Sequence, residues 1–232
     1  MKYTILATDF DGTIAHHSGV PESTLDALRR VRASGRKLFL VTGRELDDLL
    51  AVFPPINVFD SVIAENGALL FQPSTRETRI LSPQPPERFV EELLRRGVPI
   101  SVGRSIVATV EPHEYTVLEV IRDLGLEWQV IFNKGAVMVL PSGINKATGL
   151  TFVLNELGVP AAEVVGVGDA ENDHAFLRMC GLSVAVSNAL QSVKDMADWV
   201  TIGARGAGVE ELIAQLLDND LINVMCRPEC HI

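Results

Sequence analysis

The sequence has few cysteines, a deficit of positive charge and no long apolar run. Its three cysteines are too few for a disulfide framework, which is typical of a protein in a reducing compartment. The 20 Lys and Arg residues face 30 Asp and Glu residues, and the net charge of −10 has the wrong sign for binding nucleic acid or an anionic membrane. No apolar run approaches the roughly 20 residues of a membrane span, and the N-terminus enters a predicted strand rather than a signal sequence. We therefore predict a cytoplasmic protein.

The chain does contain enough apolar residues to bury a core, since 47% of its 232 residues are hydrophobic and only 22% are charged. Apolar runs typical of buried strands alternate with segments of helical periodicity. The predicted strands are 3–9, 37–41, 61–64, 164–167, 182–186 and 199–202, and the predicted helices are 21–34, 45–53, 146–157, 170–179, 189–197 and 208–217. Apolar strands joined by helices predict an α/β fold with a doubly wound parallel sheet covered on both faces.

This alternation is interrupted between residues 83 and 143. The predicted order there is helix 86–96, two strands meeting at Gly103-Arg104, helix 114–124, and two strands meeting at Asn133-Lys134-Gly135. Glycine in the turns indicates antiparallel hairpins, so we predict a small inserted α+β domain of αββαββ order. This insert, residues 83–143, is called the cap below. We expect it to lie over a discontinuous core of residues 1–82 and 144–217, with 218–232 as a tail.

Two aspartates follow the first predicted strand, in the motif Thr8-Asp9-Phe10-Asp11-Gly12-Thr13. The alternation of a strand puts Asp9 and Asp11 on one side of the backbone, and Gly12 lets the chain turn away directly afterwards. Two carboxylates at a strand end repel each other unless a cation or a proton lies between them, which favours a magnesium site. The alternative is a solvated Asp-x-Asp-Gly turn.

Polar residues also follow two other predicted strands, at the sheet edge where ligands bind in doubly wound folds. After strand 37–41, Thr42-Gly43-Arg44 offers a hydroxyl and backbone N–H groups to a phosphate, or Thr42 is simply a helix N-cap. After strand 164–167, Asp169 and Asp173 either share one face of a helix start and contact a hard cation, or cap that helix. Glu171 between them is expected to point to solvent.

Lys146 begins a predicted helix directly after the cap. A lysine at a helix N-terminus opposes the helix dipole, so it is unfavourably placed unless an anionic group lies nearby. This position favours a functional role for Lys146. The alternative is an exposed surface charge in the first turn of the helix.

These motifs, in this order, resemble the four motifs of the haloacid dehalogenase superfamily. They are Asp9-Phe10-Asp11-Gly12-Thr13, Thr42-Gly43-Arg44, Lys146 and Gly168-Asp169-Ala170-Glu171-Asn172-Asp173. The cap falls between the second and third motifs, as in the Cof-like branch. Its short form, a type IIB cap, is most similar to that of the archaeal-type phosphoglycolate phosphatases and the sucrose-phosphate phosphatase relatives. The resemblance extends from residue 3 to residue 217 and implies the Rossmann-like core of that superfamily.

The resemblance also implies a chemistry. Asp9 would attack the phosphorus of a phosphate monoester and form an aspartyl-phosphate, while Asp11 would protonate the leaving alcohol and then deprotonate the attacking water. Mg²⁺ would be held by Asp9, the backbone carbonyl of Asp11, Asp169 and Asp173. The transferring phosphoryl group would be bound by Thr42, Lys146 and the backbone N–H of Gly43, and Asn172 would orient substrate or water.

The predicted function is therefore magnesium-dependent hydrolysis of a small phosphorylated metabolite, with phosphoglycolate or a sugar phosphate as the expected substrate. Two alternatives share parts of this site: a phosphomannomutase-like phosphotransferase, which retains the phosphoryl group, and a phosphoacceptor signalling module. The cap and the motif 168–173 argue against the signalling module, which needs neither. We expect a monomer or a homodimer.

Other residues carry weaker signals. Asn66-Gly67 follows strand 61–64 and either faces the substrate or forms a plain hairpin turn. Arg104 and Lys134 lie in cap turns, where they either meet the far end of the substrate or are solvated. The spacing of three tail residues falls short of a zinc signature, and we predict a loose tail there. They are Cys226, Cys230 and His231.

Overall fold

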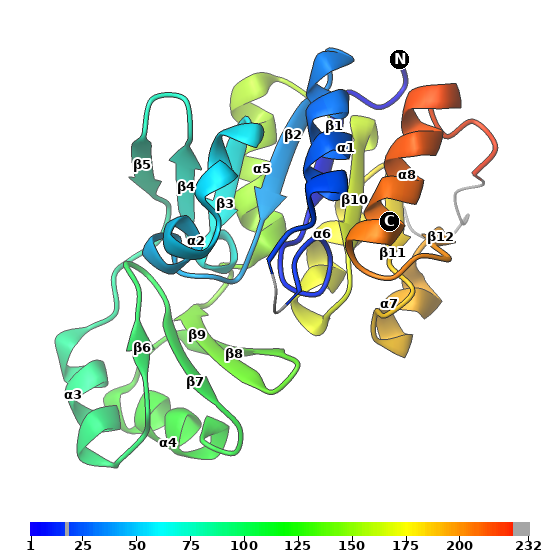
Figure 1. Cartoon of the computed structure of the whole chain (residues 1–232). Helices are drawn as coiled ribbons and strands as arrows, with labels where there is room; N and C mark the ends of the chain where they lie inside the picture. Colours follow the sequence, from blue (N-terminus) through cyan, green and yellow to red (C-terminus); the bar gives the residue numbers. More distant parts are fainter. Residues whose placement is uncertain (17–18, 225–232) are drawn as a thin grey trace.

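The computed structural model describes residues 1–16 and 19–224, and their strands form two sheets (Figure 1). The larger sheet has the order β12-β11-β10-β1-β2-β3-β4-β5, and the smaller sheet has the order β6-β7-β9-β8. The larger sheet contains β1 (Ile5–Thr8), β2 (Lys37–Val41), β3 (Ser61–Ala64), β4 (Leu69–Gln72), β5 (Glu77–Ile80), β10 (Val164–Gly168), β11 (Leu182–Ala185) and β12 (Trp199–Val200). The smaller contains β6 (Ser101–Val102), β7 (Val107–Val110), β8 (Trp128–Asn133) and β9 (Ala136–Pro141).

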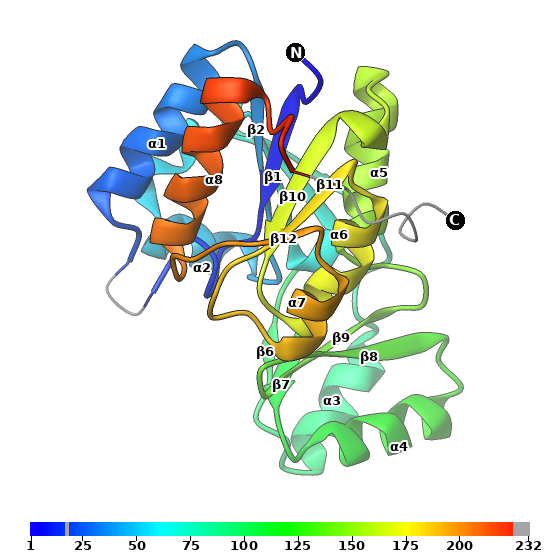
Figure 2. The ribbon, with the colours of Figure 1, turned by 90° about the vertical axis from the view of Figure 1, so that its right-hand side faces the viewer.

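The stretch of the larger sheet from β12 to β3 is entirely parallel, which confirms the predicted doubly wound α/β core. Strand β1 lies in its middle, and its first residue, Ile5, is in register with Val164 of β10 and Lys37 of β2. All residues of β1 are buried because helices cover both faces of the sheet. Helices α1 (Glu22–Ala33) and α8 (Gly206–Asn219) lie on one face, and α5 (Lys146–Leu157) and α6 (His174–Met179) lie on the other (Figure 2).

The hairpin of β4 and β5 is an addition that the sequence pattern did not predict. Both strands are antiparallel to their neighbours and extend the sheet beyond β3. Strand β4 buries only alternate residues, and all four residues of β5 are exposed. Strand β5, with the sequence Glu-Thr-Arg-Ile, therefore lacks the continuous apolar run that marks the core strands.

Several predicted boundaries shift. The predicted helix 170–179 is divided into a 3₁₀ turn, Glu171–Asp173, and α6. Helix α7 (Gln191–Met196) is shorter than predicted, whereas α8 is longer at both ends. Helix α2 (Leu46–Val52) follows β2 close to the predicted place.

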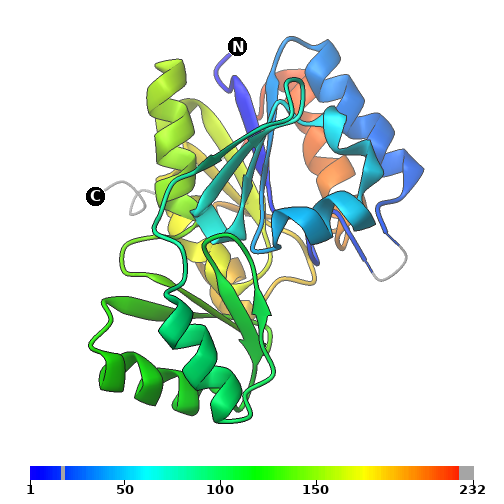
Figure 3. The ribbon, with the colours of Figure 1, turned by 90° about the vertical axis from the view of Figure 1, so that its left-hand side faces the viewer.

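The chain of the cap has the predicted αββαββ order, with α3 (Glu87–Arg95) and α4 (Glu114–Leu124) as its helices. These helices pack on one face of the smaller sheet, where Val107 and Val139 join an apolar cluster with Phe89 and Val117. Because side chains alternate along a strand, Met138 of β9 lies on the other face, toward the core. The cap lies beyond one end of the core, and two chain segments join it to the core (Figure 3). The exact domain limits of 83 and 143 stay a prediction.

The tail residues Cys226, Cys230 and His231 lie outside the described residues. Among the helices of residues 1–16 and 19–224, none is long and apolar enough to cross a membrane.

Candidate active site

Strands β1 and β10 are parallel neighbours, so the residues that follow them meet at the same end of the sheet. Asp9 follows β1, and Asp169 and Asp173 follow β10. All three are buried, and one carboxylate oxygen from each lies within 4.8 Å of the others. Three of the four predicted metal-binding residues therefore form one cluster.

Gly12 allows this cluster to close. Its φ of +84° is a left-handed conformation, and a Cβ atom at this position would lie 2.1 Å from Oδ2 of Asp169. Any side chain here would collide with a carboxylate of the cluster. The glycine thus lets the turn after β1 approach the turn after β10.

Asp173 has the capping role that the sequence offered as one of two alternatives, and it also contacts a lysine. Its Oδ2 accepts hydrogen bonds from the backbone N–H groups of Asp169 (2.7 Å) and Ala170 (2.9 Å), so it caps the turn. Its Oδ1 lies 2.5 Å from Nζ of Lys146. One carboxylate therefore both fixes the backbone and carries charge in the cluster.

Lys146 is fully buried at the first position of α5, so the alternative of an exposed surface charge is wrong. Its Nζ lies 2.6 Å from Oδ1 of Asp9 and 2.5 Å from Oδ1 of Asp173. The preceding residue, Asn145, caps the helix by accepting N–H groups of Ala147 and Thr148. These hydrogen bonds to Asn145 fix the start of α5, and this position holds the Lys146 ammonium between two carboxylates.

Burial and the neighbouring charges together raise the pKa values of Asp9, Asp169 and Lys146. Burial raises the pKa of Asp9 well above its ordinary value, and the nearby Asp173 and Asp169 raise it further, against the attraction of Lys146. Burial likewise raises the pKa of Asp169, despite its hydrogen bond from Lys134. Burial alone would lower the pKa of Lys146, but Asp173 and Asp9 outweigh burial and raise it. The carboxylates are under-compensated, and such a set of hard oxygen donors fits a divalent cation such as Mg²⁺.

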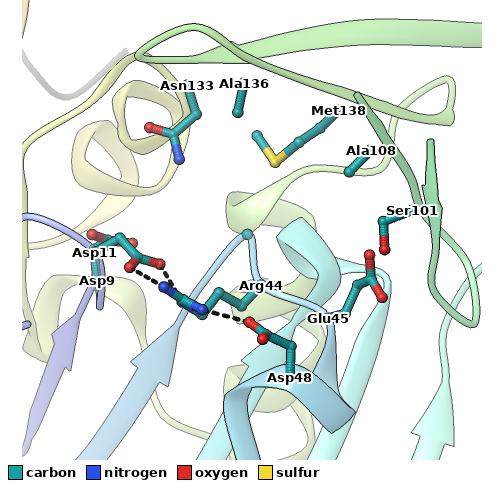
Figure 4. Close-up of a pocket in the computed structure, with 11 residues that line it drawn as sticks. Asp9, Asp11, Arg44, Glu45, Asp48, Ser101, Ala108, Asn133, Ala136 and Met138 are labelled. Carbon is teal, nitrogen blue, oxygen red and sulfur yellow. Dashed lines mark hydrogen bonds and ion pairs between the residues drawn. The ribbon is translucent and has the colours of Figure 1, made fainter. Parts of the chain in front are cut away.

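Asp11 departs from the predicted convergence of two carboxylates. It lies beside Asp9 (Figure 4), but its oxygens are bound by Arg44, with Nε–Oδ2 and Nη2–Oδ1 distances of 2.7 Å. Arg44 also pairs with Asp48 on α2. The hydrogen bonds that Arg44 donates to Asp11 raise the pKa of Arg44. The cation that pairs with Asp11 is therefore the guanidinium of Arg44. The Asp11 carboxylate is not part of the buried cluster.

The motif after β2 forms a tight loop. Thr42 is buried, and its Oγ1 accepts the N–H of Arg44 at 3.1 Å. It is not the N-cap of α2, because that position belongs to Glu45. A side chain at Gly43 would crowd its neighbours, since a Cβ would lie 2.9 Å from Sδ of Met138 and 3.4 Å from Nδ2 of Asn172. The loop thus packs closely between Met138 of the cap and Asn172 of the core.

Asn66 and Asn172 form a buried pair. Nδ2 of Asn172 donates to Oδ1 of Asn66 at 3.1 Å. Nδ2 of Asn66 and Oδ1 of Asn172 are buried without a hydrogen-bond partner in the part of the chain that the structure describes. Asn66 lies in the turn between β3 and β4, at a φ of +55°, so the turn that the sequence suggested is also present. Unpartnered buried amides suit hydrogen bonds to a bound ligand.

The sequence reasoning missed one residue of the cluster and underrated another. Nδ2 of Asn188 donates to the carbonyl of Gly12 (2.8 Å) and lies 3.4 Å from Oδ2 of Asp169. It follows β11, so the rule of polar residues at carboxyl ends of strands would have found it. Lys134, treated as a turn residue with solvation as one option, places its ammonium on Oδ2 of Asp169.

A second contact joins the cap to the core at Glu65, which the sequence reasoning did not single out. This buried carboxylate accepts the backbone N–H groups of Arg104 (3.1 Å) and Ser105 (2.7 Å) in the turn between β6 and β7. The Arg104 side chain points elsewhere, to Asp47 at 3.3 Å. Glu171 has the predicted exposure, although its Oε2 accepts the backbone N–H of Lys134 at 3.1 Å.

A pocket of about 430 Å³ opens between the core and the cap next to this cluster (Figure 4). Arg44 lies on its core side, between Asp11 and Asp48. The side chains facing it across the pocket come from the cap sheet and are short or neutral: Ser101, Ala108, Asn133, Ala136 and Met138. The pocket is large enough for a small ligand whose reacting end contacts Asp9.

Comparison with known proteins agrees with this architecture. A family model described as haloacid dehalogenase-like hydrolase matches residues 6–114 and 127–213. The phosphoglycolate phosphatase of Methanothermobacter thermautotrophicus is 29% identical over 221 residues, which cover 91% of this chain and 98% of that protein. Phosphoglycolate phosphatase 2 of Saccharolobus solfataricus is 28% identical over 225 residues, 93% of each chain.

Solved structures share the fold. A haloacid dehalogenase-like hydrolase from Bacteroides thetaiotaomicron superposes with a TM-score of 0.80 at 21% identity, over 93% of this chain and all of that one (100%). A structure described as a subclass IIB sugar phosphatase of the same superfamily superposes with a TM-score of 0.75 at 23% identity, over 94% of this chain and 100% of that one.

Proposed function

Because the chain belongs to the haloacid dehalogenase-like hydrolase family, we propose that it is a phosphatase that hydrolyses a small phosphate monoester with Mg²⁺ as its cofactor. One observation above all supports this function. Asp9 lies in a buried cluster with Asp169 and Asp173 and also lines the pocket between the core and the cap. A lone surface turn has no need of such a concentration of buried negative charge.

Asp9 is the proposed nucleophile. Lys146 holds its Oδ1 at 2.6 Å, which leaves Oδ2 to attack the phosphorus in line. The new bond joins Oδ2 to phosphorus, and the bond from phosphorus to the alcohol oxygen breaks. Water then attacks the aspartyl-phosphate, which releases inorganic phosphate and restores Asp9.

Asp11 is the proposed acid and base. It lies beside Asp9 on the rim of the pocket, with a side chain that is 43% exposed, so it can reach both the leaving oxygen and the incoming water. Arg44 fixes the plane of this carboxylate through two hydrogen bonds. Asp11 gives a proton to the departing alkoxide and takes one from the attacking water.

The remaining residues bind and position the phosphoryl group. Lys146, the Thr42 hydroxyl and the Gly43 N–H are proposed to bind its oxygens, and Asn172 is proposed to orient substrate or water. Mg²⁺, held by Asp9, the carbonyl of Asp11, Asp169 and Asp173, would neutralise charge between the nucleophile and the phosphate dianion. Because Asp173 already engages both of its oxygens, we expect it to act through a water or through Lys146.

The proposed substrate is phosphoglycolate or a sugar phosphate of similar size. The names of the relatives point to phosphoglycolate. The volume of about 430 Å³ supports a small metabolite rather than a macromolecule. A cytoplasmic location and a monomeric or homodimeric state stay predictions of the sequence.

The test is release of inorganic phosphate from phosphoglycolate, sugar phosphates and nucleotides, with Mg²⁺ and with excess EDTA. We expect Mg²⁺-dependent release that is lost in Asp9→Asn while the fold is retained. The matched control is Asp26→Asn, an exposed aspartate of α1 that pairs with Arg29. Full activity of Asp9→Asn would contradict the proposed nucleophile. Phosphoryl transfer without free phosphate would indicate a mutase, and a long-lived phosphorylated chain would indicate a signalling module.

A further inference from the structure

Lys134 occupies the tip of the hairpin between β8 and β9, where local preference does not favour lysine. Asn133 and Ala136 are paired across the hairpin, which leaves a turn of Lys134 and Gly135 with φ values of +47° and +87°. Hairpin turns with two positive φ values prefer Asn, Asp or Gly at the first position. The reason for a lysine here must therefore lie outside the turn.

The hairpin tip contacts the core at two points. The backbone N–H of Lys134 donates to Oε2 of Glu171 at 3.1 Å, and its ammonium binds Oδ2 of Asp169. Asp169 is fully buried, whereas the Lys134 side chain is 37% exposed. A residue of the cap thus brings a positive charge into the carboxylate cluster of the core.

The two lysines divide the cluster between them. Lys146 binds Asp9 and Asp173, and the ion pair of Asp169 within the described residues is with Lys134. The other groups on Asp169 are neutral donors: the Thr13 hydroxyl at 3.3 Å from Oδ1 and the Asn188 amide at 3.4 Å from Oδ2. The carboxylate oxygen that faces Gly12 and the turn after β1 is therefore the one that holds the Lys134 ammonium.

We propose that Lys134 competes with the divalent cation for Asp169, and so sets the metal affinity of the site from the cap. An ammonium and a divalent cation on one carboxylate oxygen repel each other strongly in a buried setting. Metal binding therefore displaces the Lys134 ammonium from Asp169, while the backbone of the hairpin tip keeps its contact with Glu171. This inference rests on the metal site of the proposed function.

The experiment is isothermal titration of MgCl₂, without phosphate or substrate, into the full-length protein freed of metal. Lys134→Met removes the charge at similar length. Lys134→Asn also removes it and supplies a residue that this turn prefers. We expect both variants to bind Mg²⁺ about tenfold more tightly than the wild type, because a charge-assisted hydrogen bond to Asp169 no longer has to be broken. The matched control, Arg104→Met, removes a cap-turn cation that pairs with Asp47 instead and should leave the affinity unchanged.

The outcomes separate this inference from the proposed function. Asp169→Asn should abolish binding, which assigns the measured heat to this site. Equal affinity of the wild type and both Lys134 variants, or weaker binding by the variants, would overturn the inference and leave the phosphatase function standing. Absence of Mg²⁺ binding by the wild type and by both variants would overturn the metal site and the inference together.

Discussion

The carboxylate cluster has a lysine from the core and a lysine from the cap, and the two are held very differently. Lys146 is fully buried, touches two carboxylates and starts a capped helix. The Lys134 side chain is 37% exposed, its ammonium binds one carboxylate, and the residue lies in a two-residue turn. The first counter-charge belongs to the folded core itself. The second depends on where the cap lies.

The difference shows how one cluster can be both stable and responsive. The core lysine compensates charge that the fold cannot leave uncompensated, because an unpaired buried carboxylate is costly. The cap lysine adds a counter-charge that a ligand can replace. The following predictions test this division, from the largest expected effect to the smallest.

Replacing the core lysine should have the largest effect. Lys146→Met leaves Asp9 and Asp173 buried without their cation, and we expect a loss of about 3–5 kcal/mol in the free energy of unfolding. Phosphatase activity should fall by about 10²–10³-fold, as for the loss of one preorganised donor. Urea unfolding and phosphate release measure the two effects.

The matched control for that variant is Lys134→Met. The Lys134 ammonium is partly exposed, and Asp169 keeps the Thr13 hydroxyl and the Asn188 amide as donors. Its removal should therefore cost about 1–3 kcal/mol, less than the removal of Lys146. Equal destabilisation by the two substitutions would contradict the division between a permanent and a replaceable counter-charge.

Neutralising one partner should rescue part of the lost stability. In the double variant Lys146→Met, Asp173→Asn, the amide oxygen can still accept the N–H groups of Asp169 and Ala170. We expect about 1–3 kcal/mol of recovery relative to the single variant, with no recovery of activity. Urea unfolding of the four proteins in this cycle gives the coupling. Simple additivity would mean that Lys146 does not act on Asp173.

The second contact between cap and core should be insensitive to metal. In Glu65→Gln the amide oxygen can still accept one backbone N–H of the turn, but the amide NH₂ group then lies against the other N–H. The two N–H groups are those of Arg104 and Ser105. We expect a loss of about 1–2 kcal/mol and faster hydrogen exchange of these two amides, equal with and without Mg²⁺. Glu77→Gln, on the exposed strand β5, is the control. If the effect of Glu65→Gln on stability or exchange depended on Mg²⁺, the prediction that this contact is insensitive to the metal would be wrong.

The smallest effect should appear in the pH dependence of metal stabilisation. Burial raises the folded-state pKa of Asp9 above its ordinary value of 3.8, so between that value and the raised one the folded protein holds a proton that the unfolded chain has lost. Stability of the metal-free protein therefore rises as the pH falls through this window, while protons compete with Mg²⁺. We expect Mg²⁺ to stabilise the protein by about 1 kcal/mol less at low pH, which makes the gain in melting temperature about 2–4 °C smaller. Asp9→Asn should reduce this pH dependence of the Mg²⁺-induced gain in melting temperature. An unchanged pH dependence would show that other groups cause it.

Much of the core and of the site could be predicted because their signals are local. The apolar runs gave β2 and β3 their observed limits, and the rule that ligands bind at carboxyl ends of strands brought Asp9 and Asp169 together. The exposed strand β5 carries no such signal. The partners of Lys134 and Asp11 depend on where the cap and the loop after β2 lie in space, which the spacing along the chain does not encode.

The insertion of the cap between two halves of one sheet has a consequence for synthesis of the chain. Strand β1 pairs with β2 soon after it is made, but its other neighbour, β10, follows only after the entire cap, since Ile5 pairs with Val164. The hairpin of β8 and β9 pairs residues that are close along the chain. We therefore expect the cap to fold early on the ribosome, while one edge of β1 is still unpaired. The pairing of β10 with β1 should be the slow step of folding, during which the chain is most prone to aggregate.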